Sequence, residues 1–232
     1  MSDPKVQANN IEGQLPFDIV RSLIQNKKEE YNRESEIIEL IAVSKTVQAD
    51  RICPLLEKGH KNFGENRVQE ATLKWPPLRE KWDDIVLHLI GPLQTNKVQE
   101  AVRVFDVIHS LDRKKLAASL AREFDKSDRQ LPCFIQVNIG EEDQKSGIRA
   151  TEVDEFVRTC QIEYALPIVG LMCIPPADED ATPYFALLQK IAKDNGLKQL
   201  SMGMSADYET AIQFGATHVR IGSAIFGPRI TN

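Results

Sequence analysis

The chain has 232 residues, of which 42% are hydrophobic and 27% charged, with 12 glycines and 12 prolines. This composition is that of a globular protein with a substantial core, and it excludes collagen-like, low-complexity and wholly disordered chains. The formal net charge of −5, from 29 Lys and Arg against 34 Asp and Glu, disfavours nucleic acids and anionic membrane surfaces as partners.

The cysteines, Cys53, Cys133, Cys160 and Cys173, are scattered, with no Cys-x-x-Cys pair and no Cys/His cluster at the spacing of a zinc site. We therefore expect free thiols in a reducing compartment and no bound metal. The N-terminal segment lacks the basic and apolar regions of a secretory signal, and no apolar run approaches the roughly 18 residues that span a membrane. These features predict a soluble cytoplasmic protein.

The first elements in chain order are a flexible terminus, a helix, a strand and a second helix. Residues 1–14 are polar and are expected to be flexible. Apolar residues at helical spacing after them predict a leading amphipathic helix, and residues 37–44 form a short aliphatic run typical of a buried parallel strand. The segment that follows predicts a helix with Asp50 near its start and Gly59 at its end.

The same alternation continues to the end of the chain without a linker-like stretch. Seven further strands are predicted at residues 60–65, 85–91, 105–111, 132–139, 167–174, 198–203 and 217–222. Helical patterns lie between them, among them VQEATLKW, DRKKLAASLAREFDKS, ATEVDEFVRTCQIEY, TPYFALLQKIAKDNG and SADYETAIQFG.

Strands that alternate with helices indicate right-handed βαβ units and a parallel sheet. Eight successive units favour closure into a single (β/α)8 barrel, a TIM barrel of the α/β class, over residues 15–232. The alternative is an open doubly wound sheet. It is less favoured because no G-x-G-x-x-G follows the first strand and no longer crossover separates two half-sheets.

A barrel binds its ligands at the C-terminal ends of its strands, where the βα loops converge. Polar or small residues follow most of the predicted strands at those ends: Ser44, Lys45, Glu65, Asn66, Gly91, Gln94, Asn96, His109, Ser110, Gln136, Asn138, Met172, Ser201, Arg220, Gly222 and Ser223. Lys45 directly follows the first strand and would place an amine at the mouth of the barrel. A low-dielectric site there favours a neutral, nucleophilic amine, but a surface lysine at a loop start remains open.

The last two strand ends favour a phosphate site. Barrels often bind phosphate there with backbone N–H groups and a short helix, and Gly222 and Ser223 suit that geometry. The alternative is that the glycines at these two strand ends only form tight turns. An amine and a phosphate site together indicate a ligand with an aldehyde and a phosphate, either pyridoxal 5′-phosphate (PLP) or a sugar phosphate. A sugar phosphate would be the substrate of a class I aldolase, and the position of Lys45 after the first strand favours PLP over that alternative.

Eight collinear segments carry a specific resemblance: AVSKT (42–46), NFGENRVQE (62–70), HLIGPLQTNK (88–97), HSLDR (109–113), KSGI (145–148), GLMCIPP (170–176), SMGMSADYETAI (201–212) and VRIGSAIFG (219–227). They resemble the pyridoxal phosphate homeostasis protein family, which is related to the N-terminal barrel domain of alanine racemase. The resemblance implies that PLP is the cofactor, that no metal is bound, and that the binding residues are Lys45, Asn66, Ile90, Met172, Ser201, Arg220, Gly222 and Ser223.

In this resemblance Lys45 forms a Schiff base with PLP and Arg220 lies by the pyridine nitrogen. Ser201, Gly222 and Ser223 would bind the phosphate. Of the others, Asn66 would lie near the cofactor ring and hydroxyl, and Ile90 and Met172 would line the wall. Cys173 and Ser223 depart slightly from the family pattern, since a small residue and a threonine are more common there, but both keep the expected size or hydroxyl.

The arginine has a chemical consequence, because a guanidinium cannot accept a proton and so keeps the ring nitrogen unprotonated, which makes the ring a poor electron sink. Alanine racemase adds a tyrosine from a second domain, which we do not expect here. The sequence therefore predicts a PLP carrier that acts in vitamin B6 and amino-acid homeostasis without turnover. It would be a monomer, with PLP-dependent apo-enzymes as possible recipients. A weak amino-acid racemase is the alternative, and an aldolase a further one.

Four other residues invite a functional interpretation. Lys145 could face the barrel rim and hand over PLP, but a solvated loop lysine is expected. His88 and His109 lie in apolar strands and are expected to be structural, and Cys173 is expected to be an inert buried thiol.

Overall fold

The structure is a computed structural model that describes residues 15–228. The flexible terminus predicted for residues 1–14 lies outside the described residues, as do the last four residues of the predicted domain.

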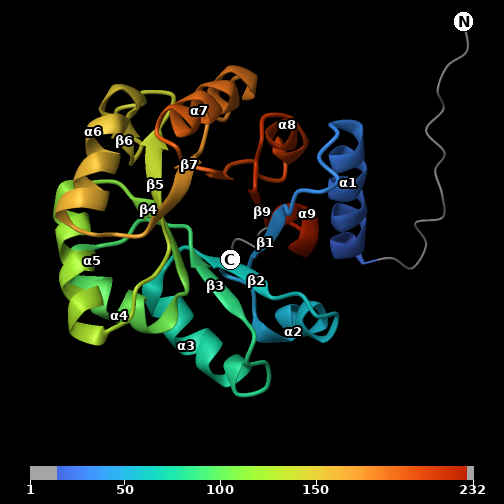
Figure 1. Cartoon of the computed structure of the whole chain (residues 1–232). Helices are drawn as coiled ribbons and strands as arrows, with labels where there is room; N and C mark the ends of the chain where they lie inside the picture. The colour runs from blue at the N-terminus through green and yellow to red at the C-terminus, as the bar shows by residue number, and fades with distance from the viewer. Residues whose placement is uncertain (1–14, 229–232) are drawn as a thin grey trace, which may run out of the picture.

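Eight parallel strands form a closed barrel, which confirms the predicted fold (Figure 1). They are β1 (Glu39–Val43), β2 (Asn62–Glu65), β3 (Val86–Leu89), β4 (Val107–Leu111), β5 (Cys133–Asn138), β7 (Ile168–Cys173), β8 (Gln199–Ser201) and β9 (His218–Ile221). Neighbouring strands pair in the order β4-β3-β2-β1-β9-β8-β7-β5, and the β4–β5 pairing closes the ring. An additional two-residue strand, β6 (Ile148–Arg149), pairs with β5 and was not predicted.

Helices surround the barrel and cover the outward faces of its strands (Figure 1). They are α1 (Pro16–Glu30), α2 (Ala49–Glu57), α3 (Val68–Arg79), α4 (Val98–Val104), α5 (Lys114–Ser127), α6 (Val153–Arg158), α7 (Thr182–Asp194), α8 (Tyr208–Gln213) and α9 (Ser223–Phe226). Shorter turns, Thr95–Lys97, Ala150–Glu152 and the π-helical Thr159–Glu163, extend α4 and α6. Since both faces of each strand are covered, most strand residues are buried, as is usual for parallel strands.

The leading helix α1 packs against α8 and α9 and so covers the last part of the barrel (Figure 1). Its buried face consists of Phe17, Val20 and Ile24, which recur at helical spacing. The predicted leading helix is therefore present and belongs to the barrel shell.

Both ends of α2 follow the sequence signals. Gly59 follows α2 with a left-handed backbone, φ +78°, as expected of a glycine that ends a helix. Asp50 lies in the first turn, after the N-cap residue Gln48, and its Oδ1 accepts the N–H of Arg51 at 3.0 Å. In this position its negative charge interacts favourably with the positive, N-terminal end of the helix dipole.

The barrel interior is unusually polar for a packed core. Its buried polar and charged residues include Glu65, His88, His109, Ser201 and Arg220, each at most 4% exposed. Since buried polar groups are costly unless hydrogen-bonded, this set indicates a specific internal network. Within residues 15–228, no helix is long and apolar enough to cross a membrane.

Candidate functional site

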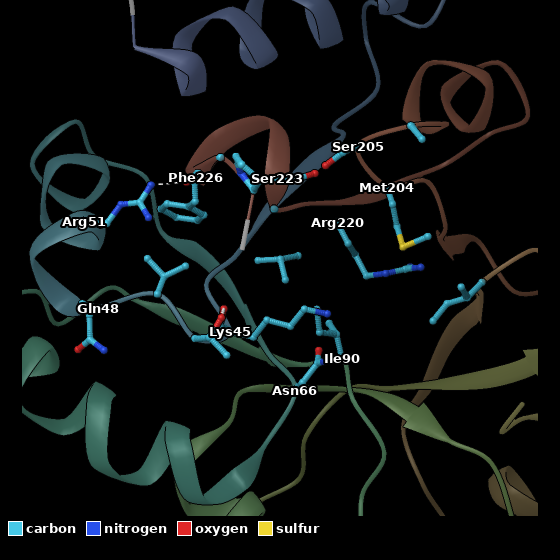
Figure 2. A pocket seen from close by; sticks show the side chains of 18 residues that line it. Lys45, Gln48, Arg51, Asn66, Ile90, Met204, Ser205, Arg220, Ser223 and Phe226 are labelled. Carbon is cyan, nitrogen blue, oxygen red and sulfur yellow. Dashed lines mark hydrogen bonds between the residues drawn. The ribbon is translucent and has the colours of Figure 1, made fainter. Parts of the chain in front are cut away.

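A cavity of about 680 Å³ opens at the C-terminal ends of the strands (Figure 2). Its walls come from the segments that follow β1, β2, β3, β7, β8 and β9. This is the end of a barrel at which ligands bind, and the volume is within the roughly 300–1,000 Å³ of small-molecule sites.

Lys45 reaches into this cavity from the loop that follows β1. The residue is half-buried, and Figure 2 shows its side chain extending toward Asn66, Ile90 and Arg220. The lysine predicted from its position after the first strand therefore lines the cavity together with three other predicted residues.

A buried ionic network fixes the backbone on both sides of Lys45. Ser44 donates its hydroxyl hydrogen to Glu65 Oε1 at 2.8 Å, and Lys74 Nζ donates to the carbonyl oxygen of Ser44 at 2.8 Å and to Glu65 Oε1 at 2.9 Å. On the other side, the Thr46 N–H donates to Glu70 Oε1 at 2.7 Å. Thr46 also has a left-handed backbone, φ +62°, a strained conformation that these contacts maintain.

Arg220, on β9, forms the floor of the cavity. Its Nη1 donates to Ser201 Oγ at 2.7 Å and its Nη2 to the carbonyl oxygen of Cys173 at 2.8 Å. Burial lowers the pKa of Arg220 from its usual value, but an arginine side chain keeps its proton at neutral pH. The site therefore contains a buried cation that can only donate hydrogen bonds.

Ser205, Gly222 and Ser223 lie on the wall formed by the last two strand ends. The Ala224 N–H, in the first turn of α9, points to Ser205 Oγ at 3.4 Å. A Cβ atom at Gly222 would lie 3.3 Å from Cβ of Val43, so a glycine keeps this part of the wall open. Hydroxyl and backbone N–H donors gather here, as a phosphate site requires.

Six of the predicted binding residues line the cavity: Lys45, Asn66, Ile90, Arg220, Gly222 and Ser223. Met172 and Ser201 do not. Both are fully buried in the barrel, where they are register partners on β7 and β8. The positions that line the cavity after these two strands come later in the chain, at Ile174 and Ser205.

Several lining residues were not predicted, among them Ile174, Ser205 and Arg51. Ser205 is in the same SMGMS segment as Ser201, and that segment is the signal that could have found it. Arg51, on α2, donates a hydrogen bond to the carbonyl oxygen of Phe226, and no motif in the sequence points to it.

Lys145 and Cys173 lie outside the cavity lining. Lys145 Nζ donates to the carbonyl oxygen of Pro175 at 3.1 Å and pairs with Glu142 at 2.5 Å. Burial raises the pKa of the Cys173 thiol to about 12, which keeps it protonated and unreactive at neutral pH.

Comparisons with known proteins agree on one family. Residues 21–229 match the family model of the alanine racemase N-terminal domain. The pyridoxal phosphate homeostasis protein of Pasteurella multocida is 39% identical over 220 residues, with 90% of this chain and 94% of the relative covered. That of Escherichia coli K12 is 38% identical over 219 residues, with the same coverage.

Solved structures are similar as well. PipY of Synechococcus elongatus with PLP bound is 32% identical with a TM-score of 0.74, over 88% of this chain and 100% of that one. The alanine racemase of Clostridium difficile has a TM-score of 0.66 at 16% identity, over 94% of this chain and 58% of that one, which shows a shared fold.

Proposed function

Because the chain belongs to the family of the alanine racemase N-terminal domain, we propose that its cavity binds PLP and that Lys45 holds the aldehyde carbon covalently. The observation that carries this proposal is the convergence of one lysine amine, one buried guanidinium and a wall of hydroxyl and N–H donors on a single cavity. The relatives named for PLP homeostasis, and PipY with PLP bound, support it.

The residues present fit this cofactor. PLP has an aldehyde that condenses with an amine, a pyridine nitrogen that accepts a hydrogen bond and a phosphate that needs several donors. Lys45 would hold the aldehyde carbon and Arg220 would donate to the ring nitrogen. Ser205, Gly222 and Ser223 would bind the phosphate. Asn66 and Ile90 would contact the ring, as the lining of the cavity favours.

Two features favour a carrier without turnover. Arg220 can only donate, so it would leave the ring nitrogen unprotonated and the ring a weak electron sink. Within residues 15–228, the titratable side chains that line the cavity are those of Lys45, Arg51 and Arg220. Racemisation requires a second acid–base group opposite the lysine, and neither arginine can serve as a base.

The proposed role is therefore to hold PLP and to contribute to vitamin B6 and amino-acid homeostasis in the cytoplasm. A monomer is sufficient, because every group assigned above comes from one chain. PLP-dependent apo-enzymes are the proposed recipients.

The alternative is a weak amino-acid racemase, favoured by the shared fold with alanine racemases. The two functions differ in whether the α-proton of L-alanine exchanges with solvent. We expect no exchange in deuterated water above the rate of free PLP, and enzyme-dependent exchange would support the racemase instead.

The proposal is tested by borohydride reduction of the PLP-loaded protein followed by intact-mass measurement. Wild-type protein should develop a visible absorption band with PLP and gain one pyridoxyl phosphate per chain. Lys45→Ala should gain none, whereas the control Lys145→Ala, which removes a lysine outside the cavity lining, should match wild type. Full labelling of Lys45→Ala would refute the assignment.

A further inference from the structure

A chain of hydrogen-bonded side chains crosses the barrel interior beneath the cavity floor and connects six strands. In order, its members are Arg220, Ser201, His109, His88, Asn62 and Glu39. The proposed PLP site uses only the first of these residues. The other five have no role in the function proposed above.

The upper half of the chain is fully buried. Arg220 Nη1 donates to Ser201 Oγ at 2.7 Å, and Nδ1 of His109 lies 2.8 Å from the same oxygen. The imidazole of His109 stacks on Phe134, with ring centroids 4.3 Å apart, which fixes the plane of the ring. Ser201 and His109 have no exposed surface, so water cannot replace either partner.

The lower half continues to the opposite end of the barrel. His109 Nε2 lies 3.0 Å from His88 Nδ1, and His88 Nε2 lies 2.9 Å from Asn62 Oδ1. Asn62 Nδ2 then donates to Glu39 Oε2 at 2.8 Å. Glu39 is the first residue of β1, at the end of the strand away from the cavity.

The two ends of the chain determine the direction of every bond between them. A guanidinium can only donate and a carboxylate can only accept. Arg220 therefore donates to Ser201, and Glu39 receives the amide hydrogen of Asn62. With its amide so oriented, Asn62 presents its oxygen to His88, which must donate from Nε2 and, as a neutral ring, accepts at Nδ1.

His109 must then donate from Nε2 to His88, because Nδ1 of His88 can only accept. Its own Nδ1 is left without a hydrogen and accepts the hydroxyl hydrogen of Ser201. Ser201 has no other hydrogen, so its oxygen presents only lone pairs to Arg220. One arrangement of hydrogens thus satisfies every group in the chain.

This arrangement requires both imidazoles to be neutral, and their surroundings favour that form. Burial lowers the pKa of His88 to about 3 and that of His109 well below its usual value. The permanent charge of Arg220 acts in the same direction, because it repels a positive charge on His109. A further proton on Nδ1 of His88 would also face the Nε2 hydrogen of His109, which places two donors against each other.

We propose that His109 and Ser201 are positioning residues for Arg220. The hydrogen-bond chain that starts at Glu39 makes the Ser201 oxygen an acceptor, which holds Arg220 Nη1 in place. The guanidinium hydrogens that do not bond to Ser201 are thereby directed into the cavity. The Cys173 carbonyl, which accepts from Nη2, assists from the other side. This inference rests on the proposed function, since the group that would receive those hydrogens is the ring nitrogen of PLP. Loss of the serine acceptor leaves the Arg220 guanidinium free to turn away from the ring nitrogen of PLP.

The direction of the chain is tested without PLP by ¹⁵N NMR of the histidine side chains in wild-type protein. We expect both His88 and His109 to carry their hydrogen on Nε2 and to remain neutral down to about pH 6, where an ordinary histidine is mostly charged. A hydrogen on Nδ1 of His109, or a charged ring at that pH, would overturn the inference.

The positioning role is tested by Ser201→Ala, with Ser110→Ala as the matched control. Ser110 is also fully buried in a barrel strand, but its hydroxyl has no hydrogen-bond partner. Ser201→Ala should weaken PLP binding roughly tenfold, the effect of losing one hydrogen bond to a charged group. It should also shift the ring-nitrogen signal of bound ¹⁵N-labelled PLP, which a merely structural change would not move.

Ser110→Ala should leave both the affinity for PLP and the ring-nitrogen signal as in wild type. Unchanged affinity and signal in Ser201→Ala would overturn the positioning role while the proposed function stands. A wild-type protein that binds no PLP would overturn the proposed function and with it this role of Arg220, and the tautomer measurement would still decide the direction of the chain.

Discussion

Glu65 shows how one buried residue holds the site in place. Its Oε1 receives hydrogen bonds from Ser44 at 2.8 Å, Lys74 at 2.9 Å and Trp75 at 3.1 Å. Burial raises the pKa of this carboxyl group, and the charge of Lys74 opposes that shift. Because Ser44 and Lys74 also hold the backbone before Lys45, the position of the proposed PLP-binding lysine depends on Glu65.

We predict that Glu65→Leu lowers the free energy of unfolding by about 3–5 kcal/mol, since it leaves the mostly buried Lys74 ammonium without its fully buried carboxylate partner. Urea denaturation of the PLP-free protein measures this. Glu70→Gln is the control, because it removes a more exposed partner of the same lysine, and it should cost about 1 kcal/mol or less. Equal losses in the two variants would contradict this view of Glu65.

At this scale the sequence shows what lies at a strand end but not how deep it lies. Lys45 could be predicted as a candidate because it directly follows an apolar strand, although its position alone left a surface lysine open. Ser201 and Ser205 belong to one short segment, and only the folded backbone shows that the second reaches the cavity. The partnership of Glu65 with Lys74 could not be predicted either, because both look like ordinary charged residues.

At the scale of elements, Gly91 follows β3 and lies against the backbone of the segment that follows β2. A Cβ atom at this position would lie 2.3 Å from the backbone oxygen of Asn66 and 2.7 Å from its Cα, distances that no real Cβ tolerates. The close approach of the two segments therefore requires glycine, and it positions Asn66 in the wall of the cavity.

We predict that Gly91→Ala displaces Asn66 and weakens PLP binding by tenfold or more, about 1.4 kcal/mol. A spectroscopic titration with PLP measures the effect. The control is Gly59→Ala at the end of α2, where a Cβ atom would meet nothing within 4 Å and only the positive φ is unfavourable. That variant should lose some stability and keep its affinity for PLP; equal affinities in both variants would contradict the role of Gly91.

Most elements could be predicted because each strand is a short apolar run with helical periodicity on both sides. All eight predicted strands are present. The helix indicated by VQEATLKW, in contrast, continues to Arg79 through Pro76 and Pro77. Trp75 and Leu78 are both buried on one face of α3. Their packing stabilises the helix beyond two prolines that, in the sequence alone, indicate a helix end.

At the scale of the molecule, each of the chain's 4 histidines has a lowered pKa. Burial is the largest cause in every case. It lowers the pKa of His60 and His218 to about 4 and that of His88 to about 3, with His109 well below its usual value. The native protein thus keeps neutral imidazoles under conditions in which the unfolded chain would be protonated.

We predict that the unfolding free energy is highest above about pH 6.5 and falls as the pH drops toward 4, because in that range the histidines take up protons only in the unfolded chain. Each histidine should contribute about 1.4 kcal/mol per pH unit below its unfolded pKa. Urea denaturation at a series of pH values measures the slope.

His60→Phe is the control for this prediction. It removes one titrating ring that contacts Phe17 and Phe63, so it should reduce the slope by the share of one histidine. An unfolding free energy that stays constant between neutral pH and about pH 5 would contradict the neutral interior.

The central claim is that Lys45 captures PLP at the mouth of this barrel. A crystal structure of the protein grown with PLP tests it most directly. We predict continuous electron density from Lys45 Nζ to the C4′ carbon of PLP, with Arg220 at the ring nitrogen and the phosphate beside Ser205 and Ser223. PLP bound elsewhere, or with C4′ separate from Lys45, would contradict the account.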